Sequence, residues 1–217
     1  MYIPHANAER RPETMLDFIE SRAFGALVTS SPSEGLFATH LPLVLDRSRG
    51  SNGVLEGHVA RGNPHHWLAS ADAGALVIFQ GADAYITPAW YAAKAEHGRV
   101  VPTWNYVAVH AYGTLRFIDD VEFLARHLDA LTDRHERGRA EPWSTADAPA
   151  EYIAQLRKAI VGVELTITRL EGKWKMSQNR SDADIDGVIT GLSSSANEGD
   201  RAVAAIVQAR RPSARTD

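Results

Sequence analysis

The chain has 217 residues, 44% of them hydrophobic, and a formal net charge of −4 at pH 7, which disfavours a protein that binds DNA mainly through its phosphates. It has no cysteine, which excludes disulfides, thiolate metal sites and a cysteine nucleophile. No stretch approaches the roughly 20 apolar residues that cross a bilayer, and the first residues lack the apolar core of a signal peptide, so we expect a soluble, cytoplasmic protein without membrane contact.

The first half of the chain predicts one helix followed by strands between polar turns. Pro12 opens a helix over residues 12–22, in which apolar residues recur at helical spacing. Pro64 suits the first turn of a second, short helix. Runs of apolar and β-branched residues bounded by turn residues predict strands at 24–30, 36–45, 54–60 and 75–88.

The second half predicts a strand over 100–113 and then mostly helices. Asp119 or Asp120 can cap the helix that follows this strand. The amphipathic stripe of that helix comprises Phe123, Leu124, His127, Leu128 and Leu131. Further helices are predicted at 149–160, 182–195 and 199–211, and a long strand or hairpin at 161–178.

These elements decide the fold class. Short strands with few long helices between them favour an antiparallel arrangement over a doubly wound parallel sheet. The sequence also lacks GxGxxG and GxxxxGK[ST], so it has neither a dinucleotide fingerprint nor a P-loop, and it lacks HExxH and GxSxG. We therefore predict an α+β protein, an antiparallel β-barrel with flanking helices.

One predicted strand carries a row of rings. In "VPTWNYVAVHAYG" the side chains on one face, with Ala108 among them, are Trp104, Tyr106, His110 and Tyr112. The other face carries mostly small groups. Such a row can pack into the protein's own core, against a second copy of the chain, or against a flat cofactor.

Polar residues gather where three of the strands end. "FATHLP" contains Thr39 and His40, "GHVARGNPHHW" contains Arg61 and Asn63, and "GKWKMSQNR" contains Lys175. Cations at such positions can bind a phosphate, and amides can both donate to and accept from the edge of a flavin or purine. The plainer interpretation is a set of structural histidines and solvated strand ends. No carboxylate or third histidine stands at metal-ligand spacing, so no metal site is predicted.

Several motifs resemble one known family. "MYIP", "THLP", "GHVARGNP", "VIFQGADAYITPAWY", "VPTWNYVAVHAYG", "LTDRHE" and "LEGKWKMSQNR" occur in the same order as in the PaiB-type FMN-binding negative transcriptional regulators, from Met1 to about Leu192. The resemblance implies a flavin-binding split β-barrel over residues 1–192, followed by a C-terminal helix and basic tail at 193–217. It further implies a homodimer with cofactor sites at the subunit interface.

If FMN binds, as the resemblance implies, the chemistry of the residues suggests which of them hold it. The phosphate needs cations, and the ring system needs a flat wall and amide edges. Thr39 and His40, on a neighbouring strand, could line the same pocket. The expected cofactor-binding residues are Thr39, His40, Arg61, Asn63, Trp104, Asn105, Tyr106, Lys175, Gln178, Asn179 and Arg180.

Three functions are compatible with these features. The first is a flavin-binding regulator in which FMN tunes an interaction that controls gene expression. The second is a flavin-dependent reductase or oxidase, because a flavin needs few protein groups to react. The third is a haem-binding split barrel that uses His40, His58 or His110 as ligand. A regulator would act through a protein partner or through DNA contacts of the basic tail around Arg210, Arg211 and Arg215.

Overall fold

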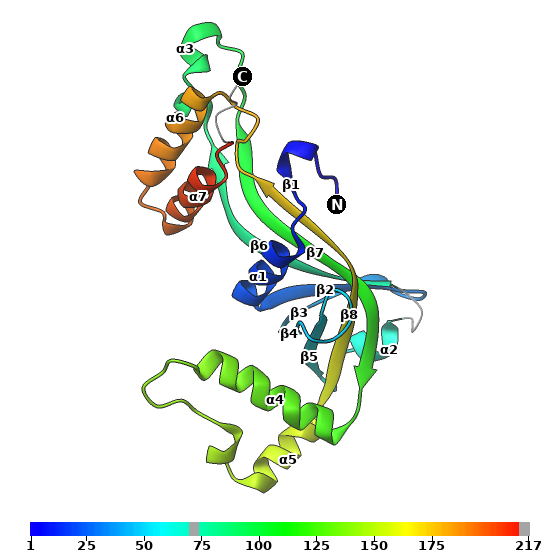
Figure 1. Ribbon diagram of the computed structural model, residues 1–217. Coiled ribbons are helices and arrows are strands. Elements are labelled where there is room, and N and C mark those ends of the chain that lie inside the picture. The colour runs from blue at the N-terminus through cyan, green and yellow to red at the C-terminus, as the bar shows by residue number, and fades with distance from the viewer. Residues whose placement is uncertain (70–73, 213–217) are drawn as a thin grey trace. The chain divides into compact units, whose positions relative to one another are not determined.

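The chain divides by packing into two compact units. Unit 1 comprises Met1–Arg11, Gln80–Val109 and Glu171–Asp217, and unit 2 comprises Pro12–Phe79 and His110–Leu170. The computed structural model describes residues 1–69 and 74–212 (Figure 1).

The strands of the described residues form one sheet in the order β3-β2-β6-β7-β8-β5-β4, with β1 paired to β8. The pairings β1·β8, β2·β3, β2·β6, β4·β5 and β5·β8 are all antiparallel, as predicted. The strands are β1 Ala8–Glu9, β2 Phe24–Ser31, β3 Gly35–Pro42, β4 Val44–Asp46, β5 Val54–Ala60, β6 Gly74–Ile86, β7 Thr103–Ile118 and β8 Ile160–Lys175.

Each unit also contains helices (Figure 1). They are α1 Pro12–Arg22, α2 His65–Leu68, α3 Ala93–His97, α4 Val121–Glu136, α5 Ala150–Lys158, α6 Asp182–Ser193 and α7 Glu198–Ala209, with short 3-10 turns η1 His5–Asn7, η2 Pro88–Trp90 and η3 Thr145–Asp147. Among the described residues, no helix combines the length and the apolar character needed to span a membrane.

Most of the predicted elements are present. However, β7 extends to Ile118 instead of ending near Gly113, and β1 and α3 were not predicted. Two further segments differ in kind. The segment 36–45 is two strands, because β3 ends at Pro42 opposite Phe24 of β2, whereas β4 begins at Val44 and pairs with β5. The segment 161–178 is a single strand that ends at Lys175, not a hairpin. The periodicity of a long strand and of a hairpin arm is the same, so the pattern alone left both open.

In unit 2, α4 packs by the stripe that the sequence predicts. Asp120 caps the helix by accepting from the N–H of Phe123 at 2.7 Å, and Phe123, Leu124 and His127 are buried. Gly162 on β8 makes room for this packing, because a Cβ there would lie 2.5 Å from the Phe123 ring. The cap and the stripe therefore place α4 across β8.

We expect Leu124→Ala to lower the free energy of unfolding by roughly 2–5 kcal/mol, because it leaves a cavity at a side chain that is 3% exposed. Leu128→Ala is the matched control, since Leu128 lies on the same helix but is only half-buried and should cost less. Urea unfolding of both variants measures the difference. Equal losses, or none, would show that the stripe is not core.

In unit 1, α6 packs on η2 through two glycines. A Cβ at Gly187 would lie 1.9 Å from the carbonyl oxygen of Trp90, and one at Gly191 would lie 2.3 Å from the Trp90 ring. The spacing of four residues puts both glycines on one helix face. On α7, which contacts α6, Val203 and Val207 are buried.

A cluster of charges joins β5 to β8 in unit 2. Glu56 lies directly opposite Glu164, and both carboxylates are buried. Arg49 donates to each of them at 2.5 Å. Arg126 donates to Glu56 at 3.1 Å, and Arg116 lies 3.5 Å from Glu164. Like charges opposite one another destabilise a strand pair, so the arginines are needed for this register.

A histidine pair connects α4 to β5. His127 is fully buried, and its Nε2 lies 3.0 Å from Nδ1 of His58. Burial, reinforced by the nearby His58 and by Arg126, lowers the pKa of His127 to about 4. Burial also lowers the pKa of His58. Both rings are therefore neutral at pH 7.

The pair makes stability depend on pH with a definite sign. The pKa of His127 lies near 6.5 in the unfolded chain, so between pH 6.5 and about 4 the unfolded chain binds a proton that the folded chain does not. The stability contributed by neutral His127 is present above pH 6.5. It is lost as the pH falls towards 4, by up to about 3 kcal/mol.

We expect His127→Leu to flatten this dependence of the free energy of unfolding between pH 7 and pH 4.5. His66→Leu is the control, because His66 is partly exposed and lies on α2. Urea unfolding at several pH values gives the slopes. A slope in His127→Leu as steep as in the parent would contradict the assignment.

Candidate functional site

The expected cofactor residues fall into two groups, one in each unit. Unit 2 holds Thr39, His40, Arg61 and Asn63, and unit 1 holds the other seven. We call the unit 1 group, together with Lys173 and Ser177, the strand-end cluster. Its expected members are Trp104, Asn105, Tyr106, Lys175, Gln178, Asn179 and Arg180.

Lys175 stands at the end of β8 and is the partly buried cation of the strand-end cluster. Its ammonium donates to the hydroxyl of Thr103 and, at 2.7 Å, to the carbonyl of Trp104. Burial lowers the pKa of Lys175, and the neighbouring charges of Lys173 and Arg180 lower it further. An anion placed here would therefore stabilise the charged ammonium.

Within the described part of the chain, no carboxylate forms an ion pair with Lys173, Lys175 or Arg180. Lys173 is 8% exposed; its Nζ lies 5.1 Å from the centre of the Tyr106 ring and donates to the carbonyl of Tyr2. Arg180 lies over the ring of buried Tyr91 at 4.4 Å. These three cations therefore lack a carboxylate counterion in the described chain. Such a group of cations suits a dianionic ligand.

Two of the three expected amides hold the turn after β8. Asn105 is fully buried, and its amide donates to Oγ of Ser177 at 3.0 Å. Ser177 has a positive φ of 62°, a strained conformation for this residue type. Gln178 accepts from the N–H of Met176 and donates to the carbonyl of Trp174. These contacts shape the turn, whereas Asn179 is exposed to a ligand.

The row of rings on β7 lies on its more accessible face, as the alternation predicted. Trp104, Tyr106, His110 and Tyr112 are partly or largely exposed, while the residues between them are buried, Ala108 of the row included. In unit 1, Trp104 meets Tyr85 edge to face at 6.0 Å, and each side chain is about half exposed. Trp104 also donates to Asp83 at 3.0 Å. Trp104 and Tyr85 therefore form an accessible aromatic surface, in which the hydrogen bond to Asp83 fixes Trp104.

In unit 2 a buried histidine joins two of the expected residues. The Nδ1 of His65 lies 2.8 Å from the hydroxyl of Thr39, and its Nε2 lies 2.9 Å from that of Thr29. Asn63 donates to the hydroxyl of Thr39 at 3.2 Å and accepts from the N–H of His65. The structure thus brings Thr39 and Asn63 together. Thr29 and His65 were missing from the expected set; the His-His pair after Pro64 was the available signal.

The other two expected residues of unit 2, Arg61 and His40, differ in their contacts and exposure. Arg61 donates to both oxygens of Asp119 at 2.7 and 2.9 Å and to the carbonyls of Lys158 and Ile160. Its guanidinium therefore fastens the end of β5 to the start of β8. His40 is exposed on β3, with its ring 6.2 Å from that of Phe24.

The histidines considered as haem ligands have different surroundings in unit 2. His40 is exposed. His58 has one ring nitrogen against His127. His110 lies 3.4 Å from the hydroxyl of Tyr112 through Nδ1.

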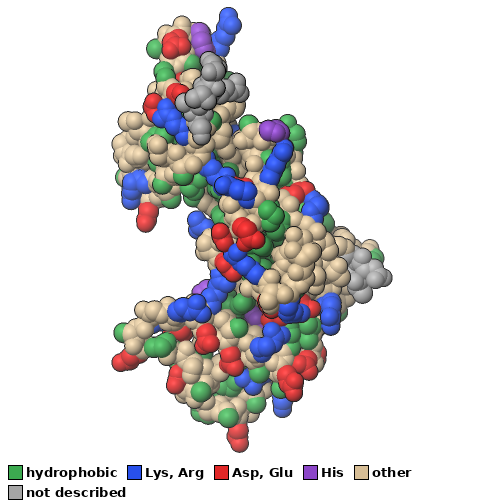
Figure 2. All heavy atoms as spheres, in the orientation of Figure 1, with side chains coloured by type: hydrophobic (Ala, Val, Ile, Leu, Met, Phe, Trp, Pro, Cys, Tyr) green, Lys and Arg blue, Asp and Glu red, His purple; other side chains and the backbone are tan. Residues whose placement is uncertain are grey.

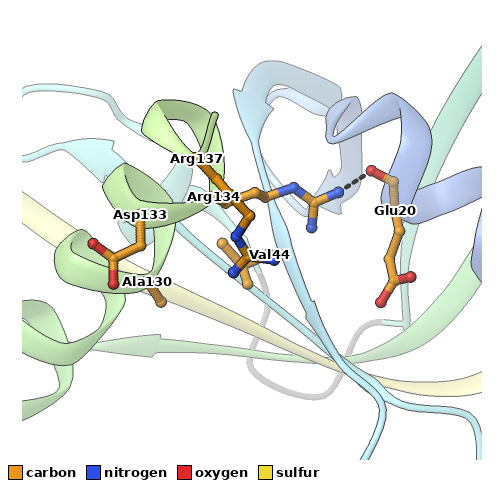
Figure 3. Close-up of a pocket in the computed structure, with 6 residues that line it drawn as sticks. All are labelled: Glu20, Val44, Ala130, Asp133, Arg134 and Arg137. Carbon is orange, nitrogen blue, oxygen red and sulfur yellow. Dashed lines mark hydrogen bonds between the residues drawn. The ribbon is translucent and has the colours of Figure 1, made fainter. Parts of the chain in front are cut away.

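A cavity of about 590 Å³ in unit 2 has a structural explanation (Figure 3). Arg134 of α4 reaches across it and donates to the carbonyl of Glu20 in the last turn of α1. The Glu20 side chain pairs with Arg47 at 2.6 Å. A cation on the carbonyl end of a helix is a cap, so this cavity reflects the attachment of α1 to α4.

Two arginines of the basic tail form ion pairs within unit 1. Arg210 pairs with buried Glu9 at 2.5 Å, and Arg211 pairs with Asp186 at 2.6 Å. Arg215 lies outside the described residues. Figure 2 shows acidic and basic side chains interspersed on the face in view. In these pairings carboxylates offset the charges of Arg210 and Arg211, so the two side chains attract DNA phosphates less.

Comparison of the sequence with known proteins identifies a family and several relatives. Residues 1–169 match the family described as "Putative FMN-binding domain". An uncharacterized protein of Emericella nidulans is 36% identical over 244 residues, which cover 97% of each chain. The Bacillus subtilis "Protease synthase and sporulation protein PAI 2" is 32% identical over 208 residues, covering 96% of this chain and 97% of that protein.

Among solved structures, the FAD and haem binding protein of Mycobacterium smegmatis superposes with a TM-score of 0.58 at 20% identity. The match covers 83% of this chain and 79% of that one. At this identity the likeness concerns the fold. It confirms the predicted split-barrel class.

Proposed function

Because this chain belongs to the family of FMN-binding domains, the PaiB-type family that its motifs resemble, we propose that it is a homodimeric flavoprotein whose bound FMN tunes a regulatory protein contact. The observation that carries the FMN site is the strand-end cluster, where Lys173, Lys175 and Arg180 have no carboxylate partner in the described chain. FMN supplies one- and two-electron chemistry when bound.

Different residues of unit 1 bind different parts of FMN in this proposal. Lys175 and Arg180 hold the phosphate, since a dianion is costly to desolvate unless cations pair with it. Trp104 and Tyr85 supply the aromatic wall for the ring system. Asn179 supplies an exposed amide for the ring edge. Asn105 and Gln178 act as positioning residues, because their amides hold the turn that presents the cations.

In unit 2, the hydroxyl of Thr39 and the amide of Asn63 form a separate polar pair, which we propose as a ligand contact within unit 2 alone. His65 orients both groups through the contacts at 2.8 and 2.9 Å. Arg61 is left out of the proposed phosphate site, because its guanidinium already makes four hydrogen bonds. His40 lies at the apolar sheet face described next.

The dimer proposal rests on an apolar sheet face in unit 2. Pairing places Ala26 of β2 between His40 and Ile78, and Val28 between Ala38 and Leu76. The face also includes Phe24 and Leu36, which are 60% and 81% exposed. A contiguous apolar face of this kind is typical of an interface between copies of a chain.

We expect light scattering to give a mass near 47 kDa, twice the 23.7 kDa of the chain. Ala38→Arg should shift the mass towards the monomer, because it places a charge in the centre of the apolar face. Thr114→Arg is the control, on an exposed position of β7. A monomeric parent at micromolar concentration would contradict the dimer, and a dimeric Ala38→Arg would contradict this face.

The regulatory role is supported by the relative whose name refers to protease synthase and sporulation. A protein partner is favoured over DNA because Arg210 and Arg211 are already paired. The test is the transcript profile of a host that lacks the gene. Complementation by the parent and by Arg211→Ala should restore the profile, and a Lys175→Ala/Arg180→Ala variant should not. Restoration by this double variant, once it is shown to lack FMN, would refute flavin tuning.

A further inference from the structure

A second cavity in unit 2, of about 430 Å³, lies beside α5. α5 buries none of its residues completely, and Leu156 on it is 47% exposed. Figure 1 shows α4 and α5 joined by a long connection, which contributes the Trp143 side chain to the cavity. The volume lies at the small end of the range of about 300–1,000 Å³ typical of small-molecule sites.

The lining of this cavity is almost entirely apolar. Leu128, Ile153, Leu156 and Ile160 provide aliphatic surface, and Trp143 provides an aromatic side chain at 45% exposure. None of its lining residues is Lys, Arg, Asp or Glu. A charged ligand would lose its hydration here without gaining a counterion, so the cavity selects a neutral molecule.

His58 supplies the polar group of this cavity. Its Nδ1 is occupied by Nε2 of His127, so Nε2 is the ring nitrogen left for a ligand. Nδ1 of His127 is buried and has no hydrogen-bond partner in the described chain. An unpaired buried N–H is rarer than an unpaired acceptor. His127 therefore keeps its proton on Nε2 and donates it to His58.

This tautomer fixes the role of His58. Since Nδ1 of His58 accepts from His127, neutral His58 carries its own proton on Nε2 and offers a donor. The ligand must then present an acceptor oxygen. Thr132 and Thr145 also line the cavity, but the Thr145 hydroxyl already donates to Asp129 at 2.5 Å.

We propose that this cavity binds a neutral, largely apolar small molecule with one acceptor oxygen, such as a ketone or ester, which accepts from Nε2 of His58. The site belongs to unit 2 and is independent of the strand-end cluster in unit 1. The protein would then bind an apolar effector in addition to the proposed flavin.

The test uses 2-acetylnaphthalene and 2-isopropenylnaphthalene, which differ in that a CH₂ group replaces the carbonyl oxygen. Equilibrium dialysis of the full chain should show saturable binding of the ketone. The hydrocarbon should bind roughly two- to tenfold more weakly, the value of one neutral hydrogen bond. Equal binding of the two, or no binding of the ketone, would overturn the proposal.

Two variants locate the bound molecule. Ala159→Leu fills the cavity and should weaken binding of the ketone at least tenfold. The ketone should quench the fluorescence of Trp143, so Trp143→Phe should remove the quenching. Trp67→Phe should retain it, because Trp67 is an exposed tryptophan of unit 2 on α2. Full binding by Ala159→Leu, or quenching that persists in Trp143→Phe, would place the molecule elsewhere and refute this site.

Discussion

A Lys175→Ala/Arg180→Ala variant is expected to bind FMN roughly 100- to 10,000-fold more weakly than the parent. Each charge-assisted hydrogen bond to a phosphate is worth about 1.5–3 kcal/mol, and the variant removes two. The pKa of Lys175 is lowered by burial and by Lys173 and Arg180. A phosphate dianion relieves that repulsion, so the loss should be larger than for an isolated exposed lysine.

The design separates loss of the phosphate contact from loss of the fold. Riboflavin has the same ring system without the phosphate, so its weaker binding should change little in the double variant. Arg211→Ala is the control protein, because Arg211 pairs with Asp186 on α6 in the same unit. Arg61→Ala should lower the thermal midpoint while the folded protein keeps its affinity for FMN.

Fluorescence titration with both flavins gives the dissociation constants. The phosphate site would lie elsewhere if the double variant bound FMN as tightly as the parent. An equal loss of riboflavin binding would show that the two cations act on the fold and not on the phosphate. A drop in FMN affinity in Arg61→Ala, with riboflavin unchanged, would return Arg61 to the phosphate site.

Arg49→Met is expected to lower the free energy of unfolding by roughly 3–5 kcal/mol. It removes a side chain that donates to both Glu56 and Glu164, which are 4% and 5% exposed. Loss of one partner from a buried ion pair leaves a buried charge with less compensation, and this costs more than the pair contributes. Arg126 and Arg116 retain contacts with one carboxylate each.

A second substitution identifies the cause. Arg49→Met/Glu164→Gln should recover part of the lost stability, because it removes one of the two opposed charges on β5 and β8. Arg47→Met is the control, since Arg47 pairs with the exposed carboxylates of Glu13 and Asp17 and with Glu20, and should cost less. Denaturant unfolding measures all four proteins. The account fails if Arg49→Met is as stable as the parent.

Local patterns in the sequence determined most of the secondary structure. The helix at 12–22 and the strand at 54–60 have the bounds that the sequence predicts. Asp120 caps α4, and the rings of β7 lie on one face of their strand. Each of these features depends on residues within a few positions of one another, so the amino-acid order is sufficient to specify it. The family motifs likewise determined the split-barrel class and the FMN-binding family.

Tertiary structure decided which of the polar residues are available to a ligand. Arg61 and Asp119 are 58 positions apart, and their ion pair exists because tertiary packing brings the residue after β5 to the residue after β7. Asn105 and Ser177 are 72 positions apart, and their contact turns an expected flavin contact into a buried support. A side chain can donate only a fixed number of hydrogen bonds, so partners distant in the sequence determine what remains for a cofactor. Residue type and spacing alone do not predict those partners.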